Sequence, residues 1–96
     1  MMPAASATDY FDQLAASGIW QSFTEEEQER LLPQLRHWDI RAGQTVLEPG
    51  CGAGRLTALL ADRVGTTGRV IACDPSAGMM ARAGARGLPP HVRLEA

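Results

Sequence analysis

Three glycines at alternate positions, directly after a short apolar run, constrain this 96-residue chain more than any other feature. Residues 46–49 (Val-Leu-Glu-Pro) lead into Gly50, Gly52 and Gly54. Glycines let a backbone turn sharply and approach a ligand where a Cβ would collide. The pattern therefore predicts a buried strand from Thr45 to Glu48, followed by a nucleotide-binding loop at the edge of a sheet.

A second apolar run supports this interpretation. The strand expected from Arg69 to Cys73 ends on Asp74, which lies 20 residues after Gly54. In nucleotide-binding α/β folds, a carboxylate at this point holds a ribose, because it can accept hydrogen bonds from both hydroxyls. Asp74 would equally suit the N-cap of the next helix, so both roles are open.

The spacing of the glycines bears on the kind of nucleotide. A dinucleotide-binding loop has the pattern Gly-x-Gly-x-x-Gly, whose third glycine would fall at position 55, which is Arg55. Glu48 would also repel a pyrophosphate, whereas it favours a ligand that carries a sulfonium and an amino group. An NAD-type dinucleotide-binding domain is therefore the weaker alternative.

The pattern Glu48-x-Gly50-x-Gly52-x-Gly54 resembles the first motif of the class I S-adenosylmethionine-dependent methyltransferases. Residues 70–83 are similar to the second-strand region of that family, and residues 92–96 resemble its third strand with a final acid-Ala pair. The resemblance covers residues 45–96 and implies the N-terminal, cofactor-binding half of such an enzyme. It also implies S-adenosylmethionine as the cofactor and S-adenosylhomocysteine as the product.

The resemblance further implies which residues bind the cofactor. In the family, the acid before the glycines lies near the methionine portion, the acid after the second strand binds the ribose, and the third-strand acid accepts the adenine amino hydrogen. The expected cofactor-binding residues are Glu48, Gly50, Cys51, Gly52, Gly54, Asp74, Pro75, Met79, Glu95 and Ala96. No catalytic residue is assigned, since a lone histidine such as His37 is more typical of surface or packing.

The expected fold class is α/β, a partial Rossmann-like three-layer α/β/α arrangement with about three parallel strands. A βαβ unit needs roughly 30 residues, so residues 45–96 hold three strands and two helices. Residues 1–8 are expected to form a flexible tail, and residues 9–44 a helical segment. Family members continue for several more strands that carry much of the acceptor site, and we therefore expect a truncated fold.

Local signals set the helix limits. Thr24 and Glu27 form a Thr-x-x-Glu capping box, which predicts a helix start. Pro33 predicts a kink in that helix, or two short helices that meet there. Further helices are expected over 9–16, over 55–64 with Gly65 as the C-cap, and after Ser76 as N-cap. The apolar side chains of these N-terminal helices are expected to pack on the sheet. The alternative is that one aromatic residue, Tyr10, Trp20 or Trp38, helps to cover the bound cofactor.

Composition limits the partners. The net charge of −2 gives no basic surface for nucleic acid, and no stretch approaches the ~20 apolar residues that span a bilayer. The N-terminus lacks a signal-peptide pattern, so we expect a cytoplasmic protein. Cys51 and Cys73 are expected as two reduced, buried thiols, and no metal site is expected because the two histidines lie far from them in the sequence.

These expectations combine into one function and one alternative. The chain is expected to bind S-adenosylmethionine as part of an enzyme that methylates an unidentified small-molecule acceptor. The methyl group of this cofactor is already electrophilic, so the main task of the protein is to align an acceptor atom with it. The alternative is a truncated, non-catalytic module or assembly partner. In that case the exposed edge of the first strand would allow self-association.

Overall fold

The computed structural model describes residues 7–17 and 23–95. Its elements are α1 (Ala7–Ser17), α2 (Glu25–His37), β1 (Thr45–Pro49), α3 (Arg55–Val64), β2 (Arg69–Cys73), α4 (Ala77–Ala85) and β3 (Val92–Glu95). The expected bounds of α3 and β2 are confirmed. Helix α1 begins at Ala7, so the last two residues of the expected tail 1–8 belong to a helix.

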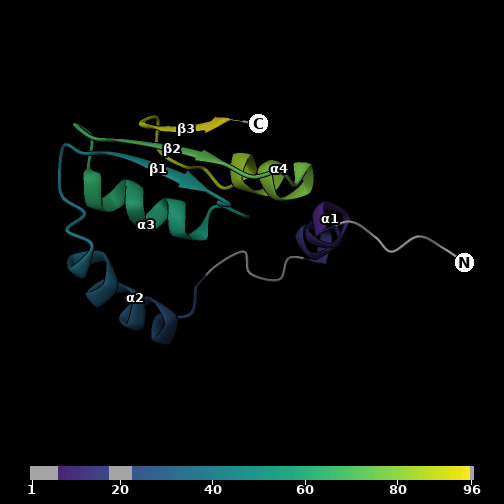
Figure 1. The fold of residues 1–96 in the computed structure, drawn as a ribbon, viewed down its shortest axis with the longest axis horizontal. Coiled ribbons are helices and arrows are strands. Elements are labelled where there is room, and N and C mark those ends of the chain that lie inside the picture. Colours follow the sequence, from purple (N-terminus) through teal and green to yellow (C-terminus); the bar gives the residue numbers. More distant parts are fainter. Residues whose placement is uncertain (1–6, 18–22, 96) are drawn as a thin grey trace, which may run out of the picture.

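The three strands form one parallel sheet in the order β1-β2-β3 (Figure 1). Val46 pairs with Val70, and Val70 pairs with Val92, so these three valines share one face of the sheet. Val70 is fully buried, and the other two pack against the same core. The expected α/β class with three parallel strands is confirmed.

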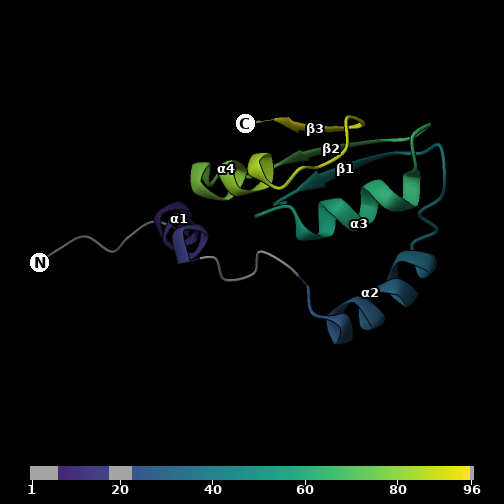
Figure 2. The same cartoon turned by 180° about the vertical axis from the view of Figure 1, so that it is seen from behind.

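Helices α3 and α4 lie on the same side of the sheet, as the front and back views both show (Figures 1 and 2). Helix α3 buries its apolar stripe against β1 and β2 because its apolar residues recur at helical spacing. The core on this side consists of Leu35, Cys51, Leu60, Ala61, Val64, Val70 and Ala72. The described residues thus form a helical layer and a sheet layer.

No helix of the described residues covers the opposite face of the sheet. Leu47 on that face is 70% exposed, and its register neighbour Ile71 is only partly buried. Cys73 lies on the same face and is exposed. The expectation of two buried thiols is therefore wrong for Cys73, because side chains alternate between the faces of a strand and this one points away from the helices.

The helix limits follow the local signals. The Thr24 hydroxyl accepts a hydrogen bond from the Glu27 amide at 3.2 Å, and the Thr24 amide donates to the Glu27 carboxylate at 3.1 Å. This confirms the capping box. Helix α2 runs without a break through Pro33, so the alternative of two short helices is wrong. Gly65 ends α3 with a φ of +66°, as expected.

Helix α4 begins as expected. The Ser76 hydroxyl accepts a hydrogen bond from the Met79 amide at 3.1 Å and so caps the helix.

Of the described helices, none combines the length and apolar character needed to cross a membrane.

Candidate functional site

A cavity of about 360 Å³ opens at the carboxyl ends of β1 and β2, within the size range of small-molecule sites. Its lining is formed by Phe11, Phe23, Glu48, Gly50, Cys51, Gly52, Ala53, Arg55, Leu56, Asp74, Pro75 and Met79. Most of the residues predicted from the sequence are therefore brought together on one cavity. The exceptions among the described residues are Gly54 and Glu95.

The glycine loop from Gly50 to Gly54 is built for tight turning. Gly52 and Gly54 have φ values of +58° and +87°, in the left-handed region that glycine adopts without strain. The Cys51 amide donates to the Cys73 carbonyl at 3.0 Å, which fixes the start of the loop at the end of β2. Gly54 then forms the N-cap of α3 and packs against Ala83, which explains why it is absent from the cavity lining.

Asp74 connects the loop to the chain that follows β2. One carboxylate oxygen accepts from the Gly52 amide at 3.0 Å, and the other accepts from the Ser76 amide at 2.8 Å. Ser76, and not Asp74, provides the side-chain cap of α4, so the alternative N-cap role of Asp74 is wrong. A carboxylate has about four lone-pair sites. Asp74, only partly buried, therefore keeps acceptor capacity for ligand hydroxyls.

Glu48 is a buried carboxyl at the end of β1, with a relative exposure of 9%. The Thr57 hydroxyl donates to it at 2.6 Å from the first turn of α3. Burial raises the pKa of Glu48, and the hydrogen bond from Thr57 opposes that rise. Thr57 is not among the residues predicted from the sequence, although a hydroxyl beside the apolar stripe of α3 was a usable signal.

Cys51 contributes a neutral side chain to the cavity. Its thiol lies 3.7 Å from the sulfur of Met80 and is 5% exposed. Burial, followed by the negative charges of Glu48 and Asp74, raises the pKa of Cys51 to about 11. The thiol therefore stays protonated near neutral pH and is unsuited to act as a nucleophile.

Two aromatic side chains that were not predicted as site residues form part of the cavity wall. Phe11 comes from α1 and Phe23 from the segment before α2. The Arg55 guanidinium lies 4.4 Å from the centre of the Phe23 ring, and it also forms an ion pair with Glu27 at 3.5 Å. These contacts hold the start of α2 against the start of α3.

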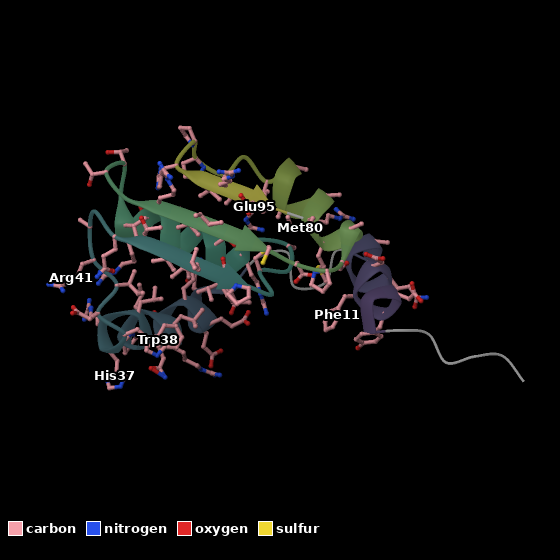
Figure 3. The ribbon with its side chains drawn as sticks, turned by 45° about the horizontal axis from the view of Figure 1, so that its top comes forward. Phe11, His37, Trp38, Arg41, Met80 and Glu95 are labelled. Atoms are coloured by element: carbon pink, nitrogen blue, oxygen red, sulfur yellow. The ribbon has the colours of Figure 1, made fainter. Side chains whose placement is uncertain are left out.

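The aromatic residues that were considered from the sequence lie elsewhere. Tyr10 and Trp38 are both 53% exposed and do not line the cavity, and Trp20 lies outside the described residues. His37 ends α2 and Trp38 is its C-cap, and both lie well apart from Phe11 on α1 (Figure 3). The sequence does not indicate that Phe11, and not Tyr10 or Trp38, lines the cavity, because this depends on how α1 packs in the fold.

Met79 and Pro75 occupy the wall near α4. Met79 is 2% exposed and packs with Ala15 and Ala53 in a second small core. It therefore serves the core and the cavity at once. Pro75 is exposed at the cavity rim.

Of the two predicted adenine contacts, the structure describes only Glu95, which does not reach the cavity. Glu95 ends β3 beside Cys73, and its carboxylate accepts from the Arg93 side chain at 2.6 Å. It does not belong to the described lining of the cavity. Ala96 lies outside the described residues. The roles of Glu95 and Ala96 stay predictions.

Comparisons with known proteins place the chain in a family. A family model described as a methyltransferase domain matches residues 46–96. The ubiquinone/menaquinone biosynthesis C-methyltransferase UbiE of Legionella pneumophila (strain Corby) is 37% identical over 75 residues, which cover 75% of this chain and 26% of that protein. The tRNA (adenine(57)-N(1)/adenine(58)-N(1))-methyltransferase TrmI of Methanocaldococcus jannaschii is 54% identical over 35 residues, which cover 36% of this chain and 12% of that protein.

A solved structure agrees with these matches. The DhpI-SAH complex superposes with a TM-score of 0.71 and 30% sequence identity, covering 92% of this chain and 41% of that chain. The present chain thus spans less than half the length of the relatives it matches. None of these matches supports the weaker alternative of a dinucleotide-binding domain. Together with the parallel sheet and the glycine loop, they show that the chain belongs to the class I S-adenosylmethionine-dependent methyltransferase family.

Proposed function

We propose that the cavity binds S-adenosylmethionine, and S-adenosylhomocysteine as the product. The single observation that carries this proposal is that Glu48, Asp74 and the glycine loop from Gly50 to Gly54 meet at one cavity. Residues 45–96 would form the binding unit, and the helical segment 9–44 would complete its wall. The chain spans only part of the length of its relatives, so methyl transfer by the whole protein is likewise a proposal.

The residues present suit the chemistry of this cofactor. Asp74 is already oriented by two backbone amides, and its remaining lone pairs can accept from ribose hydroxyls. Glu48 is a carboxyl whose ionisation is disfavoured by burial, and a cationic ligand nearby would favour the ionised form. A sulfonium or an amino group therefore fits the Glu48 side of the cavity better than an anion does.

The cofactor, when bound, supplies an electrophilic methyl group. The side chains of Phe11, Phe23 and Leu56 would exclude water from the cavity, and the carboxylates would orient the ligand. The described lining contains no histidine, and we assign no general base. Methyl transfer would then depend mainly on alignment of the acceptor atom with the methyl group.

A small-molecule acceptor in the cytoplasm is the finer part of the proposal. The match to UbiE, whose name refers to ubiquinone and menaquinone biosynthesis, covers 75% of this chain. The match to the tRNA methyltransferase covers a much shorter segment. A net charge of −2 also provides no general attraction to a polyanion.

Calorimetric titration with S-adenosylhomocysteine tests the proposal. The full chain should give measurable heat, and Asp74→Asn should lose at least about tenfold in affinity, because each lost charge-assisted hydrogen bond is worth about 1.5–3 kcal/mol. Asp62→Asn is the matched control, since Asp62 is exposed on α3 and lies outside this cavity. No heat with the unchanged chain, or equal binding by the Asp74 variant, would contradict the proposal.

An assembly role is the second candidate, and the edge of β1 is the observation that favours it. Among the described strands, β1 pairs only with β2, and Leu47 on this strand is 70% exposed. An apolar strand with one unpaired edge invites pairing with another chain. Sedimentation should then show a concentration-dependent dimer that Leu47→Lys weakens, whereas a single monomer peak at high concentration would contradict this role.

A further inference from the structure

Helix α1 is fastened to the start of α4 by one carboxylate. The Asp12 side chain accepts hydrogen bonds from the Ser76 hydroxyl and from the Gly78 amide, the latter at 2.7 Å. These two hydrogen bonds lower the pKa of Asp12, in that order of size, so the group is ionised near neutral pH. They connect residues more than 60 positions apart in the sequence.

Asp12 lies in the middle of α1, and the C-terminal end of this helix is held by a second contact. The Arg82 guanidinium donates to the Ala15 carbonyl at 2.8 Å and to the Ala16 carbonyl at 3.2 Å. These carbonyls belong to the last turn of α1, where an intrahelical partner is missing and a cation is favoured. We call the contacts of Asp12 and Arg82 with their partners the clasp.

The clasp requires a very close approach of the two helices. A Cβ on Gly78 would lie 3.2 Å from Cα of Asp12 and 3.3 Å from Cβ of Ala15. Both distances are tighter than ordinary van der Waals contact. Gly78 weakens α4 as a helix, but here it makes room for α1.

Ser76 links the clasp to the candidate cofactor site. It is fully buried, its amide donates to Asp74, and its hydroxyl donates to Asp12. Asp74 in turn accepts from the Gly52 amide. A continuous series of hydrogen bonds therefore runs from the glycine loop through Asp74 and Ser76 to α1.

The clasp also sets one wall of the cavity. Phe11 directly precedes Asp12 in α1 and lines the cavity. Figure 3 shows its place on α1. Ala15, one turn further along, packs with Ala53 of the glycine loop and with Met79. Loss of the clasp would therefore displace side chains from the cavity without removing any group that touches the ligand.

We propose that Asp12 is a positioning residue for the cofactor site, which holds α1 against α4 through Ser76 so that helix docking and cofactor binding strengthen each other. This inference rests on the proposed function of the same cavity. Linkage requires the effect to be reciprocal: if docking raises the affinity for the ligand, the ligand raises the population of the docked helix by the same factor. Two measurements on the full chain therefore report on one coupling.

The test combines hydrogen exchange with calorimetry on Asp12→Ala. Without ligand, the amides of α1 should exchange faster in this variant, while those of α3 and β2 keep their protection. Its dissociation constant for S-adenosylhomocysteine should rise about 5-fold or more, the lower end of usual coupling strengths. In the unchanged chain, S-adenosylhomocysteine should slow exchange in α1.

Three further variants separate the clasp from other effects. Asp12→Asn keeps an acceptor oxygen for the two donors and should recover most of the affinity. Gln13→Ala, on an exposed residue of the same helix, should match the unchanged chain. Phe11→Ala should weaken binding while the exchange of α1 stays slow, because it removes the wall and leaves the clasp.

The outcomes distinguish this inference from the function on which it rests. Equal affinity in Asp12→Ala despite fast exchange in α1 would overturn the coupling and leave the proposed function intact. Unchanged exchange in α1 would overturn the clasp itself. If the unchanged chain gives no heat with S-adenosylhomocysteine, the proposed function fails, and the coupling fails with it even where α1 exchanges faster in the variant.

Discussion

The Thr57 hydroxyl donates a hydrogen bond of 2.6 Å to the carboxyl of Glu48, inside the layer between α3 and the sheet. Thr57 is fully buried and Glu48 is 9% exposed. A buried carboxyl costs stability unless it is hydrogen-bonded, and an apolar residue would fill this position at lower cost. An acid whose pKa is raised by burial, placed at a cavity, is typical of a functional group.

Replacing Glu48 with Gln should raise stability and weaken cofactor binding. Burial raises the pKa of Glu48 in the folded chain above its ordinary value of 4.5. As the pH rises above 4.5, the unfolded chain ionises this group more readily than the folded chain does, so stability is lost up to the raised pKa. The variant avoids that loss.

Chemical denaturation at two pH values measures this effect. The unfolding free energy of Glu48→Gln should exceed that of the unchanged chain at pH 7, and the difference should shrink below pH 4.5. Glu29→Gln, on an exposed residue of α2, is the matched control and should change the unfolding free energy by less than about 0.5 kcal/mol. A Glu48 variant that is less stable at pH 7 would show that ionised Glu48 stabilises the fold.

Replacing Thr57 with Val should destabilise the chain by about 1–3 kcal/mol, because Glu48 loses the donor that offsets its burial. Thr57→Ser keeps the hydroxyl and should cost less. The loss should also shrink when Thr57→Val is combined with Glu48→Gln, since the two side chains interact directly. Denaturant unfolding of the unchanged chain, Thr57→Val, Glu48→Gln and the double variant measures this coupling. Strictly additive losses of stability would contradict it.

Local sequence signals predicted the elements of this fold well. Helix α3 runs from Arg55 to Val64 as expected, because its apolar spacing and the following Gly65 both act within a few residues. The capping box of Thr24 and Glu27 is confirmed for the same reason. The loop and its partner Asp74 were also predictable, since parallel strands bring their carboxyl ends to one edge.

The contacts between distant segments were not predictable from the sequence. Nothing near Asp12 indicates that it will accept from Ser76 and Gly78, because this depends on where α1 docks. The choice of Phe11 over Tyr10 for the cavity wall depends on the same docking. Cys73 is exposed because it lies on the sheet face that no described helix covers. The periodicity of a strand does not show which of its two faces will be covered.

Two glycines outside the binding loop should respond in opposite directions to alanine. A Cβ at Gly68 would lie 2.6 Å from the Val64 carbonyl oxygen and 2.7 Å from that of Gln44, both backbone atoms. Gly68→Ala should therefore cost at least about 2 kcal/mol. Gly84 has open space around it within α4, so Gly84→Ala should add about 0.5–1 kcal/mol. Thermal unfolding distinguishes them, and equal shifts for both variants would contradict this distinction.

The two cysteines should differ in reactivity. Cys73 is exposed, whereas Cys51 is buried and its pKa is raised to about 11, so at pH 8 very little of it is thiolate. Iodoacetamide at pH 8 should label Cys73 first, as peptide mass spectrometry would show. A Cys73→Ser chain should then label slowly, and S-adenosylhomocysteine should slow it further because Cys51 lines the cavity. Fast labelling of folded Cys73→Ser would contradict the burial of Cys51.

Gly52 and Gly54 should separate the demands of the ligand from those of the fold. The sequence predicts that any Cβ at Gly52 is harmful, yet such a Cβ would have no atom within 4 Å apart from those of its neighbours in the chain. With a φ of +58°, Gly52→Ala should cost only about 1–2 kcal/mol of stability.

The main effect of Gly52→Ala should be on affinity, because Gly52 lines the cavity and the added methyl group has open space around it. Gly54→Ala should instead lose more stability, since its φ is +87° and its Cβ would lie 3.2 Å from that of Ala83. Paired unfolding and S-adenosylhomocysteine titrations measure both quantities. If Gly52→Ala unfolds earlier than Gly54→Ala and binds normally, the glycines serve the fold alone, and their alternation has no bearing on the ligand.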